Sequence, residues 1–144
     1  MVKAGSMDSG AVLVLVALAA ATAFGVVRLR TDGKVTLHLP GHHVSPEELG
    51  HDMGERATLL QFSSPYCQPC KATHEQLERT AAQHEGVTHV DLQVADHLDM
   101  VNKLHVMRTP TTVLLDRKGA VRYRAEGVPR ADELLQALER TLAH

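Results

Sequence analysis

The sequence predicts an α/β domain with a mixed central sheet and helices on both faces, preceded by one long apolar helix. Apolar runs of strand length alternate with segments of helix length along most of the chain. The chain then closes with a strand, a tight turn, a second strand and a helix, which is typical of a sheet that mixes parallel and antiparallel pairs. A total of 144 residues leaves room for one domain of this kind.

Residues 10–27 read GAVLVLVALAAATAFGVV and contain no charged side chain. About 17 to 25 apolar residues cross the hydrocarbon core of a bilayer, so this segment reaches the length of a transmembrane helix. We therefore expect residues 1–33 to form an N-terminal transmembrane anchor with its flank, and residues 34–144 to form the α/β domain. Two alternatives stay open. Ala21-Thr22-Ala23 has the small-x-small form of a signal-peptide cleavage site, and the segment could instead be a buried core helix.

Basic residues are distributed unevenly around the apolar segment. Lys3 and the terminal amine precede it, whereas Arg28, Arg30 and Lys34 follow within seven residues of its end. The positive-inside rule places the more basic flank in the cytoplasm. The sequence therefore predicts a single-pass membrane protein whose domain faces the cytoplasm. The prediction rests on a difference of two basic side chains between the two flanks.

Two strands and two helices are expected in the first half of the domain. Residues 34–39 (KVTLHL) alternate apolar and polar side chains, as a strand does. Ser45 has the features of an N-cap for a short helix to about residue 51, because a proline and two acids follow it. The apolar run 57–62 (ATLLQF) is expected to be a central strand covered on both faces. A helix is expected over 68–84, and its inner face is expected to include Ala72, Leu77 and Ala81.

The second half of the domain is expected to hold three strands and two helices. The strand 87–94 alternates apolar and polar residues, and a short helix follows over 96–104. TTVLLD at 111–116 has the composition of a buried strand, and DRKG is a turn into an alternating strand at 120–124. Leucines at helical spacing predict a terminal amphipathic helix over 130–142.

Charge and composition exclude nucleic-acid binding. Lys and Arg number 15 against 17 Asp and Glu, so the formal net charge is -2 and no basic stripe is implied. Aromatic residues make up 3% and Trp is absent, which leaves few rings for stacking on bases. We therefore expect no nucleic-acid partner.

The two cysteines, Cys67 and Cys70, are separated by Gln68 and Pro69 at the start of the expected helix 68–84. Unpaired backbone N–H groups and the positive end of the helix dipole at this position favour a Cys67 thiolate. Cys70 lies one turn further in, so we expect it to be less accessible and to attack a mixed disulfide formed by Cys67. Pro69 fits the first turn because its missing N–H would have no partner there.

With LLQFSSPYCQPCK after a strand and MRTPTTVLLDRKGAVRY further on, the sequence resembles the thioredoxin-like family over nearly all of residues 34–144. The resemblance implies a three-layer fold and thiol-disulfide exchange without a cofactor or metal. It implies disulfide substrates and an electron-donating thiol reductase as partners. It also implies that Pro110 is cis beside the cysteine pair and that Thr109 offers backbone groups to a substrate strand.

The sequence departs from this family where the family has a buried acid. Strong reductases of the family carry an Asp six residues before the first Cys, and this chain has Gln61 there. Asp91 falls where many members have a Lys. We hypothesise that Asp91 has become the proton relay for Cys70, with Gln61 holding its carboxylate; the alternative is an exposed strand residue.

Three further positions around the cysteine pair are notable. Tyr66 replaces the common Trp before the first Cys, and Gln68 replaces the usual Gly between the cysteines. Such changes alter the redox potential by an amount that one sequence does not define. His74 stands four residues after Cys70, so it shares its helix face. This histidine either acts on the thiol or a metal, or is simply packed in the domain.

The sequence therefore predicts a membrane-tethered thiol-disulfide oxidoreductase that works as a protein-disulfide reductase. If the domain faces outward, a disulfide oxidant or a cytochrome-maturation thioredoxin becomes the alternative. A metal-binding module is another alternative, with zinc or copper held by the two cysteines and the histidines His42, His43, His51 and His74. A purely structural disulfide is disfavoured, because a four-residue ring constrains little unfolded chain.

Overall fold

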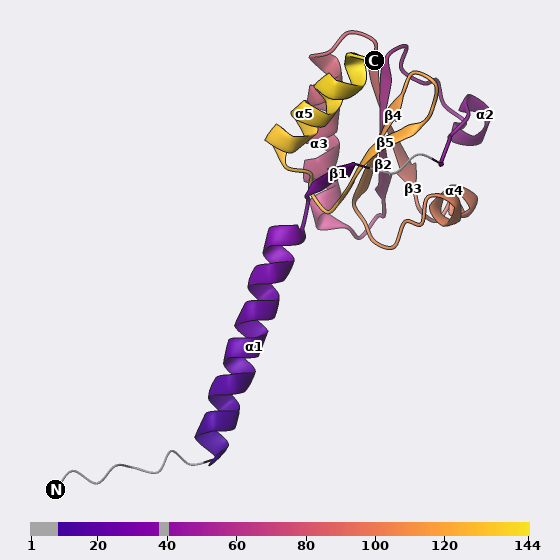
Figure 1. Cartoon of the computed structure of the whole chain (residues 1–144). Helices are drawn as coiled ribbons and strands as arrows, with labels where there is room; N and C mark the ends of the chain where they lie inside the picture. Colours follow the sequence, from indigo (N-terminus) through magenta and orange to yellow (C-terminus); the bar gives the residue numbers. More distant parts are fainter. Residues whose placement is uncertain (1–8, 38–40) are drawn as a thin grey trace, which may run out of the picture. The chain divides into compact units, whose positions relative to one another are not determined.

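The computed structural model describes residues 9–37 and 41–144 (Figure 1). Contacts between residues divide the chain into two compact units, Met1–Thr31 and Asp32–His144. This division falls two residues before the boundary expected from the sequence, because Asp32 and Gly33 contact the domain. The end of the expected strand 34–39 and Lys3 lie outside the described residues.

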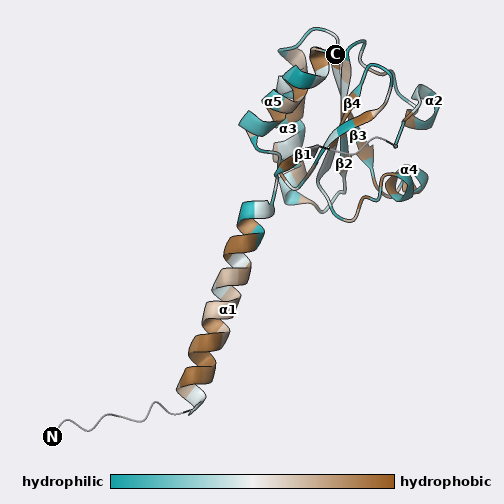
Figure 2. Ribbon diagram, in the orientation of Figure 1, coloured by the Kyte–Doolittle hydropathy of each residue, from teal (hydrophilic) through white to brown (hydrophobic). Residues whose placement is uncertain are grey.

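The first unit is the helix α1 (Ser9–Thr31). It is apolar along most of its length (Figure 2) and is long and apolar enough to cross a membrane, properties that it shares with signal sequences. The hydroxyl of Thr22 donates to the carbonyl of Leu18 at 2.8 Å, which satisfies a polar group inside the apolar segment. None of the described residues of α1 is buried. The core-helix interpretation of this segment was therefore wrong.

The second unit is built on a five-stranded mixed sheet. Its strands are β1 (Val35–Leu37), β2 (Ala57–Ser63), β3 (Val87–Gln93), β4 (Thr111–Asp116) and β5 (Val121–Glu126). Their order across the sheet is β1-β5-β4-β2-β3. β2 and β3 are parallel, and the other neighbouring pairs are antiparallel. The mixed sheet expected from the sequence is confirmed.

Helices cover both faces of this sheet (Figure 1). The helices are α2 (Pro46–Leu49), α3 (Gln68–Ala82), α4 (Leu98–Lys103) and α5 (Ala131–Leu142). α3 and α5 pack on one face, where Leu77, Leu134 and Leu138 meet Leu59 of β2. α2 and α4 pack on the other face, where Leu49 and Met100 meet the opposite side of β2. The result is the expected three-layer α/β fold.

The central strand β2 is buried at every position because both of its faces are covered. Phe62 and Leu60 point to the α2 and α4 side, whereas Leu59 points to α3 and α5. Burying each of these side chains stabilises the fold by about 1.5–3 kcal/mol. Gln61 follows the same alternation, so a polar side chain lies between β2 and α3.

The inner face of α3 differs in part from the expectation. Its buried residues are Cys70, Thr73, Leu77 and Thr80. Ala72, expected inside, is exposed. The face of α3 that packs on the sheet therefore carries Cys70, and Ala72 lies on the exposed face.

Candidate active site

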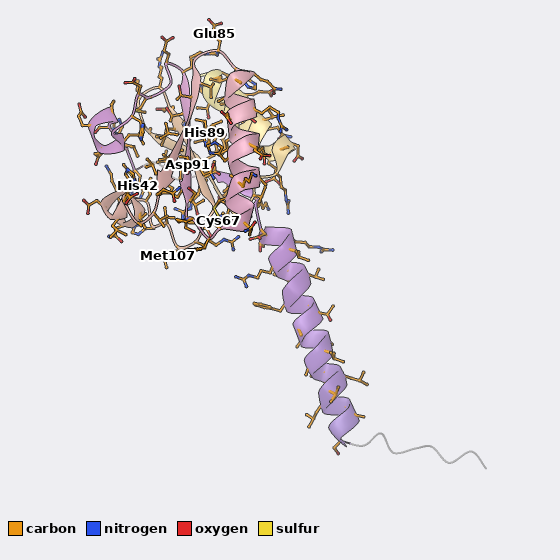
Figure 3. The ribbon with its side chains drawn as sticks, turned by 180° about the vertical axis from the view of Figure 1, so that it is seen from behind. His42, Cys67, Glu85, His89, Asp91 and Met107 are labelled. Atoms are coloured by element: carbon orange, nitrogen blue, oxygen red, sulfur yellow. A yellow bond between two sulfur atoms is a disulfide. The ribbon has the colours of Figure 1, made fainter. Side chains whose placement is uncertain are left out.

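Strand directions bring two functional loops together at one end of the sheet. β2 ends there, and because β4 runs antiparallel to β2, β4 starts there. The loop after β2 carries Cys67, and the loop before β4 carries Pro110. Figure 3 shows Cys67 and Met107 toward this end of the domain and Glu85 toward the opposite end. Segments about 40 residues apart in the sequence thus form one surface.

Cys67 and Cys70 form a disulfide with an S–S distance of 2.07 Å and a Cα–Cα distance of 5.3 Å. Cys67 is the N-cap of α3, and Cys70 lies in the first turn of the helix. Cys67 is half-buried, whereas Cys70 is only 5% exposed. The two sulfurs therefore differ in access, with Cys67 the one that an incoming molecule reaches first.

The residues around Cys67 leave its surface open. Tyr66 is 95% exposed, and Gln68 and Pro69 are exposed as well. In the reduced protein, the Cys67 sulfur at the N-cap would lie against the positive end of the α3 dipole. Such a position favours the thiolate over the thiol. The pair can therefore offer a nucleophile to a disulfide in a large partner.

The loop before β4 lies beside the cysteine loop. The Thr109–Pro110 peptide bond is cis, as the family resemblance implied. The hydroxyl of Thr109 lies 3.4 Å from that of Ser64, three residues before Cys67. Pro110 is buried, and its carbonyl accepts a hydrogen bond from the N–H of Gly127 at 2.8 Å. Thr109 is half-buried, and the role of its backbone groups in substrate binding stays a prediction.

A row of polar residues crosses the sheet beneath α3. Gln61 of β2 stands in register with Asp91 of β3 on one side and with Thr112 of β4 on the other. The amide nitrogen of Gln61 donates to the carbonyl of Cys70 at 2.9 Å, and its amide oxygen lies 3.1 Å from Nε2 of His89. Asp91 is the neighbour of Gln61, as expected, but the expectation that Gln61 holds its carboxylate was wrong: the Gln61 amide bonds to the helix and to His89.

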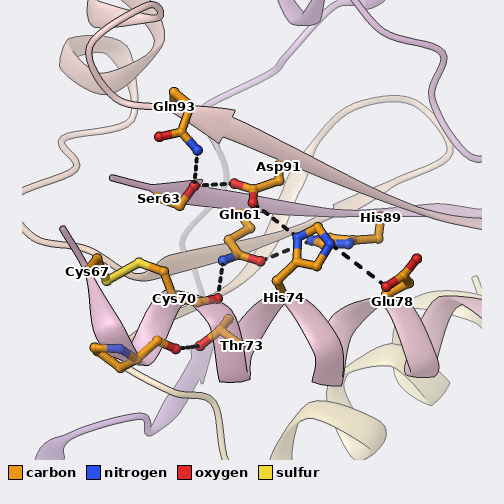
Figure 4. Close-up of polar contacts among 11 residues, drawn as sticks. Gln61, Ser63, Cys67, Cys70, Thr73, His74, Glu78, His89, Asp91 and Gln93 are labelled. Atoms are coloured by element: carbon orange, nitrogen blue, oxygen red, sulfur yellow. Dashed lines mark hydrogen bonds and ion pairs between the residues drawn. A yellow bond between two sulfur atoms is a disulfide. The ribbon is translucent and has the colours of Figure 1, made fainter. Parts of the chain in front are cut away.

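The carboxylate of Asp91 is held from two sides (Figure 4). The hydroxyl of Ser63 donates to Oδ1 at 2.5 Å, and Nδ1 of His74 on α3 lies 3.1 Å from Oδ2. Ser63 in turn accepts from the amide of Gln93 at 2.8 Å. The side chain of Asp91 is 24% exposed. Asp91 is therefore not an exposed strand residue, because it is partly buried and joins β3 to both β2 and α3. Its role as a proton relay stays a prediction.

His89 is a site residue that the sequence reasoning missed. Its ring lies 4.8 Å from that of His74, and burial, followed by the charge of His74, lowers the pKa of His89 to about 4. Because the Gln61 nitrogen already donates to Cys70, the Gln61 oxygen must accept, so Nε2 of a neutral His89 carries the proton. The alternation along β3 could have identified His89, since it shares a face with Asp91.

The metal-binding alternative finds no converging ligands. In residues 9–37 and 41–144, no group of three or more His, Cys, Asp or Glu side chains has an arrangement that could hold a metal ion. His74 contacts Asp91 and Glu78, while Cys67 and Cys70 are bonded to each other. The geometry thus gives this alternative no support.

Comparisons with known proteins agree with this architecture. The chain is 29% identical over 89 residues to the mitochondrial thioredoxin of Bos taurus, covering 61% of this chain and 53% of that protein. It is also 29% identical over 65 residues to thioredoxin domain-containing protein 2 of Rattus norvegicus, covering 45% of this chain and 12% of that protein. The chain therefore spans about half, or much less, of the length of these curated relatives.

A solved structure shows the same fold. Thioredoxin f from spinach chloroplast, in its short form, superposes with a TM-score of 0.54 at 24% sequence identity, covering 61% of this chain and 78% of that one. The family model described as a thioredoxin-like domain matches residues 51–142, which is more than half of the chain and includes both the cysteine loop and the cis-proline loop. On this evidence the chain belongs to the thioredoxin-like domain family.

Proposed function

We propose that the chain is a membrane-tethered thiol-disulfide oxidoreductase that reduces protein disulfides with the Cys67-Gln68-Pro69-Cys70 dithiol. One observation carries the proposal: an accessible cysteine at the N-cap of α3 is bonded to a buried one, beside the cis-Pro110 loop. A disulfide that only stabilised the fold would gain little here, because its ring is four residues long. The arrangement suits a bond that opens and closes.

The reaction begins with the Cys67 thiolate. It attacks one sulfur of a substrate disulfide, which forms a mixed disulfide and releases the other substrate sulfur as a thiolate that takes up a proton. Cys70 then loses its proton, and its thiolate attacks the Cys67 sulfur. This step closes the Cys67–Cys70 disulfide and frees the second substrate thiol. The substrate gains two electrons, and the protein dithiol loses two.

The second step needs an acceptor for the Cys70 proton. Gln61, fully buried behind Cys70, has no acidic group. Asp91 stands beside Gln61 in the sheet and is hydrogen-bonded to His74, which is one helical turn from Cys70. Asp91 is therefore the proton relay in this proposal. Its partially exposed partner, His74, connects the relay to solvent.

The direction of transfer depends on the side of the membrane. The proposal places the domain in the cytoplasm, supported by Arg28, Arg30 and Lys34 after the apolar segment, and an electron-donating thiol reductase there would restore the dithiol. A reporter fused to the C-terminus, active only in one compartment, tests this. A cytoplasmic signal is expected. A signal from outside would contradict the reductase assignment and favour the outward-facing disulfide oxidant or cytochrome-maturation role.

The activity is tested with the purified full chain in detergent micelles. Insulin reduction in the presence of dithiothreitol should be accelerated by the wild type and not by Cys67→Ser. Titration with zinc, followed by counting of free thiols, separates the metal alternative: a redox protein keeps both thiols reactive. No acceleration of insulin reduction, together with stoichiometric masking of both thiols by zinc, would overturn the proposal.

A further inference from the structure

The end of the domain that carries the cysteine pair is also the end where the chain enters the domain. β5 runs antiparallel to β4, and β1 runs antiparallel to β5. The end of β5 and the start of β1 therefore lie at the same end of the sheet as the end of β2 and the start of β4. Asp32, the first residue of the domain, therefore lies at the same end of the sheet as the loops that carry Cys67 and Pro110.

Contacts hold this entry segment to the loop that bears the cis-proline. The carboxylate of Asp32 accepts a hydrogen bond from the guanidinium of Arg108, which directly precedes Thr109. The N–H of Gly33 donates to the carbonyl of Glu126 at 2.7 Å. The next residue, Gly127, donates to the carbonyl of Pro110. The entry of the chain is thus held to the cis-proline loop directly, through Asp32 and Arg108, and indirectly, through the end of β5.

Backbone geometry restricts this entry further. Gly33 has φ +69°, and a Cβ built on it would lie 2.0 Å from the carbonyl oxygen of Val128. Its own carbonyl accepts a hydrogen bond from the N–H of Arg130 at 3.1 Å. Only glycine allows this approach. The segment that connects the domain to α1 is therefore packed against the domain and is not a free linker.

Connectivity then limits how far the cysteine pair lies from a membrane that α1 spans. α1 continues for four residues beyond Val27, the end of the uncharged segment, which is about 6 Å of helix. Three strand spacings, about 15 Å, separate β1 from β2. The step from Thr31 into Asp32 and the turn from Ser64 to Cys67, closed by a hydrogen bond from the N–H of Cys67 to the carbonyl of Ser64, add about 10 Å. Cys67 therefore lies within about 30 Å of the hydrocarbon core, at any angle between α1 and the domain. The other end of β2 is about 20 Å further along the strand.

Exposed apolar side chains gather around the same loops. Tyr66 next to Cys67 is 95% exposed, Met107 next to Arg108 is 84% exposed, and Val128 next to Gly127 is 40% exposed. Large apolar side chains exposed on loops at one end of the sheet offer contacts to a partner segment. An extended segment of a partner can lie across these loops, and the reach of about 30 Å places the segments next to the transmembrane helix of another membrane protein within range.

We propose that the substrate is a disulfide in the juxtamembrane segment of another membrane protein. The inference rests on the proposed function and on α1 being retained as an anchor. The Cys67–Cys70 dithiol passes two electrons to that disulfide, its own disulfide closes, and the two substrate sulfurs leave as thiols. Both partners are confined to one surface, so their effective concentration is raised without any new contact.

The experiment uses the full chain in phosphatidylcholine vesicles together with a synthetic single-span peptide. The peptide carries two cysteines, closed as a disulfide, starting five residues after its apolar segment. Dithiothreitol supplies electrons, and the rate measured with Cys67→Ser is subtracted as background. The same vesicles are assayed with insulin, a soluble substrate that reports the outward-facing, active protein.

Two insertions between Thr31 and Asp32 test the reach of the domain. Four Glu-Ala-Ala-Ala-Lys repeats extend α1 by about 30 Å, whereas 20 Gly and Ser residues form a flexible linker that lets the domain return to the surface. The helical insertion should lower the peptide rate, relative to the insulin rate, about tenfold or more. The flexible insertion should lower it less.

The outcomes distinguish this inference from the proposed function. If the helical insertion leaves the ratio of peptide to insulin rates at the wild-type value, the juxtamembrane substrate is contradicted while the reductase function stands. A peptide rate that falls about tenfold or more with the helical insertion and clearly less with the flexible one, with insulin rates equal in all three proteins, supports it. If no variant reduces insulin above background, the proposed function fails and this inference fails with it.

Discussion

The ring of His74 on α3 donates a hydrogen bond to the carboxylate of Asp91 on β3, with Nδ1 3.1 Å from Oδ2. His74 stands four residues after Cys70, so the two share one face of the helix. The contact therefore holds a carboxylate beneath the helix face that carries the buried sulfur. In this chain the acid comes from the edge strand β3, and the central strand contributes the neutral Gln61.

The proposed relay predicts an altered pH profile for Asp91→Asn. An amide cannot accept the Cys70 proton, so the second step would depend on solvent bases, and the rate should fall about tenfold or more at pH 7 and recover as the pH rises. Insulin-reduction rates from pH 5 to 9 measure this. Asp96→Asn, at an exposed aspartate in the loop after β3, is the matched control. Identical profiles for Asp91→Asn and the wild type would rule out the relay.

His89 predicts a specific loss of stability in acid. Its pKa is lowered to about 4 in the folded chain, so between pH 6.5 and 4 the unfolded chain binds more protons. The stability contributed by neutral His89 is complete above pH 6.5 and is lost as the pH falls through 4. The full shift corresponds to about 3 kcal/mol, which screening at this partly exposed ring reduces to about 1–2 kcal/mol.

The measurement compares urea unfolding of the wild type and His89→Gln at pH 7 and pH 4. Gln keeps an N–H donor for the Gln61 oxygen but does not titrate. The wild type should lose about 1–2 kcal/mol more than the variant over this range. An equal loss in both proteins would show that His89 titrates normally in the folded chain.

The side chain of Gln61 should stabilise the fold through its hydrogen bonds to Cys70 and His89. Gln61→Leu keeps the volume but leaves the Nε2 proton of His89 without its acceptor, and an unsatisfied buried group costs about 1–3 kcal/mol. Thermal unfolding of the full chain in micelles measures the loss. In a double variant with His89→Phe, the unpaired donor is removed, so the combined loss should be smaller than the sum of the two single losses. Strict additivity would mean that the pair does not interact.

Gly33 and Gly50 form a matched pair for testing the entry segment. Both have positive φ, at +69° and +66°, but a Cβ on Gly50 meets nothing within 4 Å, whereas one on Gly33 meets the Val128 carbonyl. Gly50→Ala should therefore cost only the strain of about 1 kcal/mol. Gly33→Ala should cost clearly more, about 2 kcal/mol or above, because the backbone must move. If both variants lost the same free energy of unfolding in chemical denaturation, the close packing of Gly33 against Val128 would be contradicted.

The layers of the domain could be predicted because hydrophobic patterns are local. The apolar run at 57–62 indicated a strand covered on both faces, and β2 is buried throughout. The inner face of α3 was harder to identify because two threonines lie in it. Thr73 and Thr80 donate to carbonyls four residues earlier, at 3.1 and 2.8 Å. Because these hydrogen bonds satisfy their hydroxyl groups, the two threonines can be buried on the face where alanines were expected.

The cysteine pair could be read from its spacing, but the polar contacts behind it could not. Those contacts depend on how α3 packs against β3, which joins residues 17 positions apart in the case of His74 and Asp91. Sequence adjacency placed Asp91 beside Gln61 correctly. It could not show that the Gln61 amide turns to Cys70 and His89 instead. The place of β1 beside β5 is likewise a contact between distant segments.

The central claim, that Cys67 is the attacking sulfur and Cys70 the resolving one, is tested most directly by trapping the mixed disulfide. The Cys70→Ser and Cys67→Ser proteins are each incubated with a disulfide-bearing substrate and separated on a non-reducing gel. The account predicts that Cys70→Ser accumulates a covalent adduct through Cys67, while Cys67→Ser forms almost none, because Cys70 is only 5% exposed. Equal adducts from both variants, or an adduct from Cys67→Ser alone, would contradict it.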